Sequence, residues 1–225
     1  MNTAIIVAAG TGNRLGADLP KQYVQIQNKP VIRYSMERFD EAPSIDEIAV
    51  VVARDEIERF KGLLEGFEIR KSVRVVVGGS TRALSVWNGL QSIAGDGGIV
   101  AVHDAARPLV TTDEIERTIA AAAATGAACL TAPVNDTLKK VSEGVITSTI
   151  DRGQVRRALT PQAFRVGLLR QAFAESELGS DVTDECYLVE KLGHPIASVE
   201  GSSRNIKITV ADDLVVATAF LAGQL

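Results

Sequence analysis

The sequence predicts an α/β fold of three layers, in which helices cover both faces of a mostly parallel sheet. Apolar, β-branched runs alternate along the chain with segments of helical periodicity, the pattern of a wound α/β fold. Most of these runs are continuously apolar, as expected for strands buried on both faces. With 225 residues and neither repeats nor linkers, the chain is expected to form one domain over 1–225.

The expected strands are short apolar runs: Thr3–Ala8, Glu47–Val52, Val73–Val77, Ile99–His103 and Ala128–Val134. The expected helices have apolar residues every three to four positions: Val31–Phe39, Asp55–Leu64, Thr81–Ala94, Asp113–Ala124, Val166–Ser176, Asp184–Lys191 and Asp212–Leu221. Caps support three of the helices. Thr111-x-x-Glu114 is a capping box, and Ser80 and Thr209 are suited to cap the helices that follow them.

One segment departs from this alternation. Asn135–Arg157 is polar and rich in β-branched residues, and Glu143-Gly144 provides a turn near its centre. We interpret the segment at about 135–157 as a β-hairpin arm that projects from the sheet. Because an isolated two-stranded ribbon is only marginally stable in water, the arm is expected to pack on a partner. The alternative is a mobile surface hairpin.

Composition excludes several classes of function. The net charge of -4 gives no basic footprint for a nucleic acid, and no apolar run approaches the ~20 residues of a membrane span. A strand that begins at Thr3 leaves no signal or transit peptide before it. Cys129 and Cys186 lack metal-ligand spacing and are expected to be reduced core thiols. These features indicate a cytoplasmic protein.

The loop after the first expected strand is rich in glycine, between Gly10 and Gly16. It does not match the dinucleotide fingerprint, because the third glycine comes one residue late and no acidic residue follows about 20 positions on. It does not match the P-loop either, because Lys21 does not follow a glycine at the required spacing. Small residues still allow backbone amides to approach a phosphate closely: Ala8, Ala9, Gly10 and Gly12.

Two cations, Arg14 and Lys21, lie in the same loop, and Pro20 fixes the backbone before Lys21. Positive charge beside exposed amides suits a polyphosphate whose charge grows during a reaction. We therefore predict a polyphosphate site here. The alternative is an ordinary surface turn with solvated Arg14 and Lys21.

Seven motifs follow one another between residue 3 and about residue 217: AAGTGNRLGADLPKQY, GGSTRALSVWNGL, VHDAARP, APVNDTLKK, LTPQAF, VTDE and NIKIT. In this order they resemble the 2-C-methyl-D-erythritol 4-phosphate cytidylyltransferase family of sugar and polyol-phosphate nucleotidyltransferases. The resemblance implies a Rossmann-like nucleotidyltransferase fold. It also implies transfer of CMP from CTP to 2-C-methyl-D-erythritol 4-phosphate with release of pyrophosphate, in non-mevalonate isoprenoid biosynthesis. It further implies Mg²⁺ and a homodimer formed through the arm.

This reaction joins two anions and needs no general base, because a phosphate monoester is already largely ionised near pH 7. Catalysis is expected from positioning and cationic stabilisation. His103 is therefore expected to be structural rather than catalytic.

By the resemblance, three cations act on the transition state: Arg14, Lys21 and Lys207. The nucleotide contacts are Ala8, Ala9, Gly10, Thr11, Gly12, Gly79, Ser80, Ser85 and Asp104. The acceptor contacts are Arg107, Thr137, Arg152, Thr160, Thr183 and Asp184. Asp104, at the carboxyl end of a strand, is also assigned to Mg²⁺.

Some of these assignments have a purely structural alternative. Lys207 could instead be an edge-strand lysine that keeps the strand soluble, and Arg107 could form a buried ion pair with Asp104. On the arm, Arg152 would complete the acceptor site of the partner subunit, and its guanidinium suits a bidentate contact with phosphate. The arm lacks the aromatic residue that the family often has after its Asp-Arg pair and carries Arg156 and Arg157 instead.

Three other functions are compatible with parts of the sequence. A ribitol 5-phosphate cytidylyltransferase shares the glycine loop, an HDA-x-RP motif and NIKIT, but APVNDTLKK and the IDR segment favour methylerythritol phosphate as the acceptor. A noncatalytic nucleotide-binding regulatory module would not need the cations Arg14, Lys21 and Lys207. A dehydrogenase would need a different glycine spacing.

Overall fold

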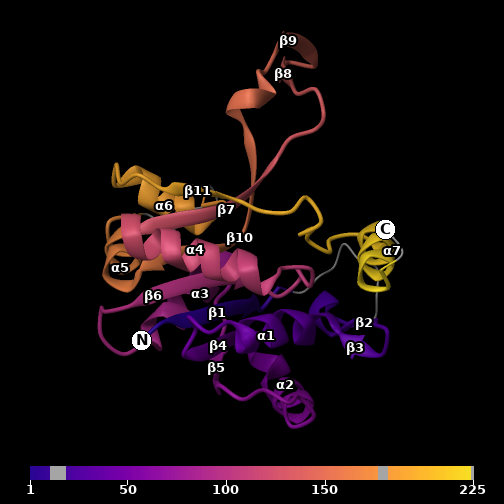
Figure 1. The fold of residues 1–225 in the computed structure, drawn as a ribbon, viewed down its shortest axis with the longest axis vertical. Coiled ribbons are helices and arrows are strands. Elements are labelled where there is room, and N and C mark those ends of the chain that lie inside the picture. Colours follow the sequence, from indigo (N-terminus) through magenta and orange to yellow (C-terminus); the bar gives the residue numbers. More distant parts are fainter. Residues whose placement is uncertain (11–18, 177–181, 224–225) are drawn as a thin grey trace.

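The computed structural model describes residues 1–10, 19–176 and 182–223. In these ranges seven strands form one sheet, in the order β11-β7-β10-β6-β1-β4-β5 (Figure 1). The strands are β1 (Thr3–Ala8), β4 (Glu47–Val52), β5 (Ser72–Val77), β6 (Ile99–Asp104), β7 (Ala127–Pro133), β10 (Arg156–Arg165) and β11 (Ala197–Glu200). β10 is antiparallel to both of its neighbours, and the other pairings are parallel. The prediction of a mostly parallel sheet is confirmed, although β10 and β11 were not expected.

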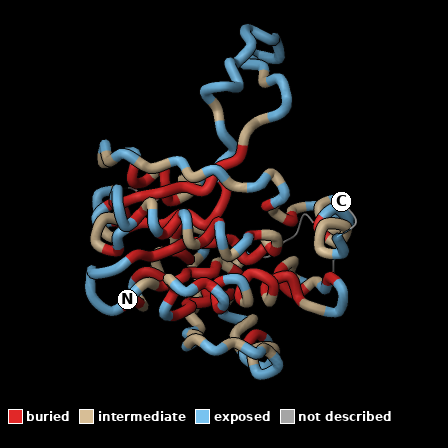
Figure 2. Tube along the Cα trace, in the orientation of Figure 1, coloured by how far each residue is buried: buried red, intermediate tan, exposed pale blue. Residues whose placement is uncertain are grey.

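The helices are α1 (Val31–Glu41), α2 (Ile57–Leu64), α3 (Arg82–Gln91), α4 (Thr112–Thr125), α5 (Val166–Ala174), α6 (Glu185–Lys191) and α7 (Ala211–Leu221). One buried cluster joins α1, α2 and α4 to the sheet, through residues such as Phe39, Phe60 and Ile115. The other joins α3, α5 and α6 to it, through residues such as Leu90, Phe164 and Leu188. Figure 2 shows the resulting buried sheet between two helical layers, so the three-layer prediction is confirmed.

Short elements complete the fold. The three-residue helices are η2 (Lys21–Tyr23), η3 (Arg54–Glu56) and η4 (Arg152–Gln154). A small hairpin of β2 (Gln25–Ile26) and β3 (Lys29–Pro30) shares a separate apolar cluster with α1 and α7, in which Ile26, Ile208 and Ala217 are buried. This cluster holds the segment before α7, which carries Lys207, close to α1.

The structure confirms one predicted cap and corrects two. The Thr111 capping box is present, because its hydroxyl accepts from the Glu114 amide and the Glu114 carboxylate accepts from the Thr111 amide. Ser80 does not cap α3, since the hydroxyl that accepts from the Leu84 amide belongs to Thr81, which directly precedes the helix. Thr209 does not cap α7. The carboxylate of Asp213 takes the free amides there, and the Thr209 hydroxyl donates to the Lys207 carbonyl.

The predicted arm is a hairpin of β8 (Lys139–Ser142) and β9 (Val145–Thr149), and it stands away from the sheet in Figure 1. Glu143 and Gly144 both have positive φ, as the tight turn between the strands requires. All residues of both strands are exposed, as the pale blue trace in Figure 2 shows. No helix in the described ranges is long and apolar enough to cross a lipid bilayer.

Candidate active site

The carboxyl ends of β1, β5 and β6 meet at one edge of the sheet and enclose a cavity of about 360 Å³. The chain runs from β1 to β4 on one side and places β6 on the other, so the cavity lies where the strand order reverses. Its size is within the range of small-molecule sites. The glycines before α3 are closely packed beside this cavity: a Cβ at Gly78 would lie 2.4 Å from the Ala9 Cβ, and one at Gly79 would lie 2.4 Å from the Leu84 Cβ.

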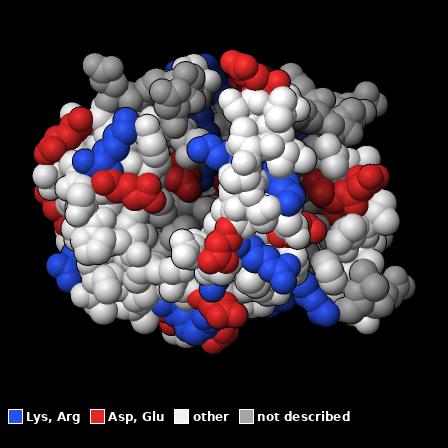
Figure 3. All heavy atoms as spheres, turned by 90° about the horizontal axis from the view of Figure 1, so that it is seen from above, with Lys and Arg blue, Asp and Glu red and all other residues white. Residues whose placement is uncertain are grey.

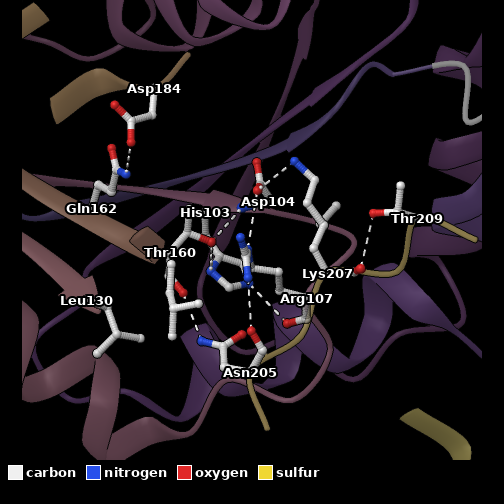
Figure 4. Close-up of polar contacts among 12 residues, drawn as sticks. His103, Asp104, Arg107, Leu130, Thr160, Gln162, Asp184, Asn205, Lys207 and Thr209 are labelled. Atoms are coloured by element: carbon white, nitrogen blue, oxygen red, sulfur yellow. Dashed lines mark hydrogen bonds and ion pairs between the residues drawn. The ribbon is translucent and has the colours of Figure 1, made fainter. Parts of the chain in front are cut away.

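Asp104, the last residue of β6, is surrounded by three cations from different segments. Arg82 Nε lies 3.0 Å from Oδ1, Lys207 Nζ lies 2.9 Å from Oδ2, and Arg107 Nε lies 3.4 Å from Oδ2. Figure 4 shows Lys207 and Arg107 reaching the carboxylate from different sides. Both oxygens of Asp104 are therefore held in ion pairs inside the chain.

Charge rather than burial determines the ionisation of this carboxyl. Burial alone would raise its pKa, but the attraction of Arg82, Lys207 and Arg107 outweighs burial and holds the pKa of Asp104 well below its usual range. Glu185, at the start of α6, adds a second buried carboxylate to the cluster. Three cations against two carboxylates leave a net positive charge, which suits the binding of anions.

Elsewhere on this face, acidic and basic side chains alternate. Figure 3 shows no broad field of one sign on the face from which the arm projects. The positive charge of the cavity is therefore local.

Thr160 and His103 form a chain of hydrogen bonds that begins at the backbone amide of Asp104. The Thr160 hydroxyl accepts from the Asp104 amide at 3.1 Å and lies 3.0 Å from His103 Nδ1. His103 Nε2 lies 3.2 Å from the Arg107 carbonyl, so it carries the proton and Nδ1 accepts from Thr160. Burial lowers the pKa of His103 to about 4, so the ring is neutral at pH 7. These contacts fit the structural role expected of His103.

Asn205 ties the Lys207 segment to the same network. The side-chain amide of Asn205 donates to the backbone carbonyl of Thr160 at 3.0 Å. The backbone carbonyl of Asn205 accepts from the Arg107 guanidinium at 2.9 Å. Asn205 is completely buried. The peptide bond between Thr160 and Pro161 is cis. Residues 205–207 are therefore fixed against the end of β6 by hydrogen bonds as well as by the ion pair of Lys207.

The sequence prediction missed two members of this cluster, Arg82 and Glu185. One terminal nitrogen of Arg82 lies 2.7 Å from Glu185 Oε1 while its Nε holds Asp104. Both residues lie inside motifs that were recognised, GGSTRALS and VTDE. In both cases a charged residue directly after the cap residue of a helix, Thr81 for α3 and Asp184 for α6, was the available signal.

The structure brings most of the expected nucleotide contacts together. The cavity is lined by these expected contacts: Ala8, Ala9, Gly10, Gly79, Ser80, Ser85 and Asp104. It is also lined by the expected catalytic cations Lys21 and Lys207, together with Arg82. Thr11, Gly12 and Arg14 lie outside the described residues. From the first turn of α3, the Ser85 hydroxyl reaches back to the preceding loop, where it accepts from the Gly79 amide at 3.1 Å and donates to the Thr81 carbonyl at 2.8 Å. Ser85 thus shapes this loop.

The expected acceptor contacts are spread more widely. Arg107 and Thr160 lie behind Asp104, and Arg107 forms the buried ion pair that was its alternative reading. Asp184 caps α6 and accepts from the Gln162 amide at 2.9 Å, with Thr183 exposed beside it. Thr137 and Arg152 are exposed on the arm, where Arg152 donates to the Asn135 carbonyl at 2.6 Å.

The residues present do not fit a resident Mg²⁺ at Asp104. Both carboxylate oxygens are paired with cations, and a metal ion there would face the charges of Arg82, Arg107 and Lys207. Across the described part of the chain, no group of three or more His, Cys, Asp or Glu side chains could hold a metal ion.

Comparisons with known proteins show the family of the chain. The chain matches the family described as 2-C-methyl-D-erythritol 4-phosphate cytidylyltransferase over residues 2–223. A protein of that name from Syntrophotalea carbinolica is 45% identical over 220 residues, which cover 96% of this chain and 94% of the relative. Another, from Desulforamulus reducens, is 41% identical over 221 residues, which cover 97% and 94%.

Solved structures agree. The 4-diphosphocytidyl-2C-methyl-D-erythritol synthase of Anaerococcus prevotii superposes with a TM-score of 0.85 at 29% identity, over 99% of this chain and 98% of its own. The 2-C-methyl-D-erythritol 4-phosphate cytidylyltransferase of Francisella tularensis gives a TM-score of 0.81 at 33% identity, over 100% and 99%. None of these matches favours a ribitol phosphate enzyme, a regulatory module or a dehydrogenase. The chain belongs to the 2-C-methyl-D-erythritol 4-phosphate cytidylyltransferase family and is a cytidylyltransferase.

Proposed function

We propose that the cavity at Asp104 is where this chain carries out the reaction of its family. An oxygen of the phosphate group of 2-C-methyl-D-erythritol 4-phosphate attacks the α-phosphorus of CTP. A new P–O bond forms, the bond between the α- and β-phosphates breaks, and pyrophosphate leaves with the electron pair. The products are the CDP-linked alcohol and pyrophosphate.

The observation that carries this proposal is that Lys21 and Lys207 line one cavity, although they come from opposite ends of the chain. Cations fixed before the substrates arrive lower the repulsion between two anions and stabilise the charge that develops on the α-phosphate and the leaving group. Lys207 is fixed by Asp104 at 2.9 Å. Arg14 is assigned to the same task from the glycine-rich loop, and this role stays a prediction.

The loop from Gly79 to Thr81 is proposed to read cytosine. It lines the cavity, and Ser85 holds it in a tight turn through the Gly79 amide. A small, rigid loop leaves room for a pyrimidine and excludes purines by size. Asp104 is proposed to orient the cations around the ribose and the phosphates.

We propose that Mg²⁺ takes part in the reaction as the complex of the metal ion with CTP. Magnesium in nucleotide enzymes takes many of its ligands from substrate phosphates and water. This role agrees with the described contacts of Asp104, in which both carboxylate oxygens are paired with cations.

The arm is proposed to form a homodimer in which Thr137 and Arg152 complete the acceptor site of the partner subunit. Four large apolar side chains are exposed on it: Val141, Val145, Ile146 and Ile150. An exposed apolar patch on a projecting hairpin is typical of an interface. The cytoplasmic location stays a prediction from the sequence.

The reaction is tested by measuring pyrophosphate release from CTP with Mg²⁺ and a panel of alcohol phosphates. Turnover is expected with 2-C-methyl-D-erythritol 4-phosphate and at most weakly with ribitol 5-phosphate. Lys21→Ala serves as the matched inactive control. Release without any acceptor would point to a simple CTP hydrolase, and preference for ribitol 5-phosphate would refute the proposed acceptor.

The shared site is tested by mixing two inactive chains, Lys21→Ala and Arg152→Ala. If Arg152 serves the neighbouring subunit, heterodimers contain one intact site and regain activity. Tagged chains purified as heterodimers show that mixing took place. Heterodimers that stay inactive would contradict the proposed role of Arg152.

A further inference from the structure

Arg82 joins two buried carboxylates that come from distant parts of the chain. Its Nε lies 3.0 Å from Asp104 Oδ1 at the end of β6, and a terminal nitrogen lies 2.7 Å from Glu185 Oε1 at the start of α6. Arg82 itself is the first residue of α3, directly after the loop that lines the nucleotide cavity. One guanidinium thus connects the nucleotide loop, Asp104 and the helix that follows Thr183 and Asp184.

Glu185 is poorly placed to touch a substrate. Its side chain is completely buried and does not line the cavity. Arg82 is the only cation within ion-pair distance of it among the described residues. Its Oε2 has no hydrogen-bond partner among the described residues, which makes its burial costly. A carboxylate kept in so unfavourable a place, and directed at one arginine, acts through that arginine.

We propose that Glu185 and Arg82 are positioning residues for cytidylyl transfer. Glu185 fixes the guanidinium of Arg82, and Arg82 holds Asp104 by Oδ1. Oδ2 is then left to hold Lys207, whose Nζ lies 2.9 Å away. With one oxygen held, the carboxylate cannot rotate, so the ammonium group of Lys207 keeps one position before the substrates bind. This inference rests on the proposed function, because it assumes that Lys207 acts on the phosphates.

The geometry requires an arginine at position 82. A guanidinium is planar and offers donors in separate fixed directions, so it can reach two carboxylates at once. A lysine has the same charge but presents a single nitrogen on a flexible stem. Arg82→Lys should therefore keep the charge of the cluster and lose the alignment of Asp104.

The test measures kcat and KM for both substrates in Arg82→Lys, Arg82→Met and Glu185→Gln. We expect kcat to fall by about 10²-fold in both arginine variants, as for a small misplacement of a reacting group. Glu185→Gln should lower kcat by about 10-fold, since it keeps the shape of the side chain and loses its charge. KM for CTP should change by less than about threefold in all three variants. Arg117→Met is the matched control, because Arg117 forms an exposed ion pair with Asp113 on α4, away from the cavity.

A second measurement separates positioning from other roles. If Arg82 acts through Lys207, then Arg82→Met combined with Lys207→Met should be no slower than Lys207→Met alone. If Arg82 instead touches CTP directly, Arg82→Met raises KM for CTP while Glu185→Gln behaves as wild type, and the inference is overturned. It is equally overturned if the losses in kcat multiply in the double variant, or if Arg82→Lys keeps the wild-type kcat.

The failure of this inference can be told from the failure of the proposed function. A wild-type protein that releases no pyrophosphate from CTP and 2-C-methyl-D-erythritol 4-phosphate would refute the function. An active wild type with unchanged Arg82 and Glu185 variants would refute the positioning role alone. Arg82→Lys and Glu185→Gln stay close to the volume of the original side chains and are checked by thermal unfolding, so the result does not depend on the folding of Arg82→Met.

Discussion

The carboxyl end of β6 and the β8–β9 arm are stabilised in opposite ways. At the end of β6, charged side chains are buried or half-buried and pair with one another: Asp104 has a side chain only 9% exposed and forms three ion pairs. On the arm the apolar side chains are exposed, at 64% for Val145 and 63% for Ile146. The first region has its geometry set by the fold of a single chain, whereas the second has apolar surface that the described part of the chain leaves uncovered. Substitutions in the two regions should therefore change different quantities.

The largest effect is expected from Lys207→Met. If the cluster at β6 is arranged for catalysis, kcat should fall by about 10²–10³-fold, as for the loss of one electrostatic stabiliser. KM should change little, because the interaction matters most in the transition state. Steady-state kinetics of pyrophosphate release measure both quantities.

Stability is the control for this prediction. Asp104 keeps Arg82 and Arg107 as partners in Lys207→Met, so the midpoint of thermal unfolding should stay close to that of the wild type. A variant with normal kcat and a lowered midpoint would show that Lys207 is structural. The charged cluster at β6 would then not be arranged for catalysis.

The second prediction concerns the pH dependence of the free energy of unfolding, and it tests whether His103 in the β6 network is buried. The pKa of His103 falls from 6.5 in the unfolded chain to about 4 in the fold, because burial disfavours the charged ring. Between these two values the unfolded state binds more protons, so the free energy of unfolding decreases as the pH falls through this window. The loss should reach about 3 kcal/mol between pH 7 and pH 4.

The matched variant is His103→Gln, which keeps a donor for the Arg107 carbonyl but does not titrate. Urea unfolding at pH 7, 6 and 5 compares it with the wild type. Asp104 titrates below this range, because its pKa is lowered, and Glu185, whose pKa burial raises, changes stability in the opposite direction. The difference between the two proteins therefore isolates His103. Parallel curves would mean that the ring is hydrated, and the β6 network would then be less enclosed than the contacts indicate.

The sequence predicted the strand that carries Asp104 better than it predicted the ion pairs between distant segments at this site. The run Ile99–Val102 followed by His103 and Asp104 was enough to place a carboxylate at the end of a buried strand. The Arg82–Glu185 contact joins residues that are 103 positions apart, and no local pattern specifies such a pair. Tertiary packing alone brings α3 and α6 together, so this part of the site needed the structure.

The strand β10 shows why part of the sheet was missed. Its first residues are Arg156 and Arg157, and it contains Pro161, which argues against a central strand. The strand forms because Pro161 lies in the irregular stretch between Ala158 and Gln162, where its pairing with β7 shifts register. The arm hairpin was found from sequence because its signal is local: a Glu143-Gly144 turn between two β-branched runs.

The smallest effect on the stability of the chain is expected from Ile146→Glu on the arm. Its side chain is exposed, so the free energy of unfolding of the isolated chain should change by less than about 0.5 kcal/mol. If the arm forms a dimer, the same substitution places a charge in an apolar interface, and the dimer should dissociate at least about 10-fold more readily. Sedimentation at several protein concentrations measures the dissociation constant.

The comparison of kcat with oligomeric state completes this test. Activity should fall only at concentrations where Ile146→Glu is monomeric, because the β6 cluster is contained in each chain while Arg152 would be supplied by the other. Thr147→Glu adds a charge one position further along the same strand and is the matched control. If Ile146→Glu is monomeric yet fully active, each chain holds a complete site, and the arm then serves assembly alone.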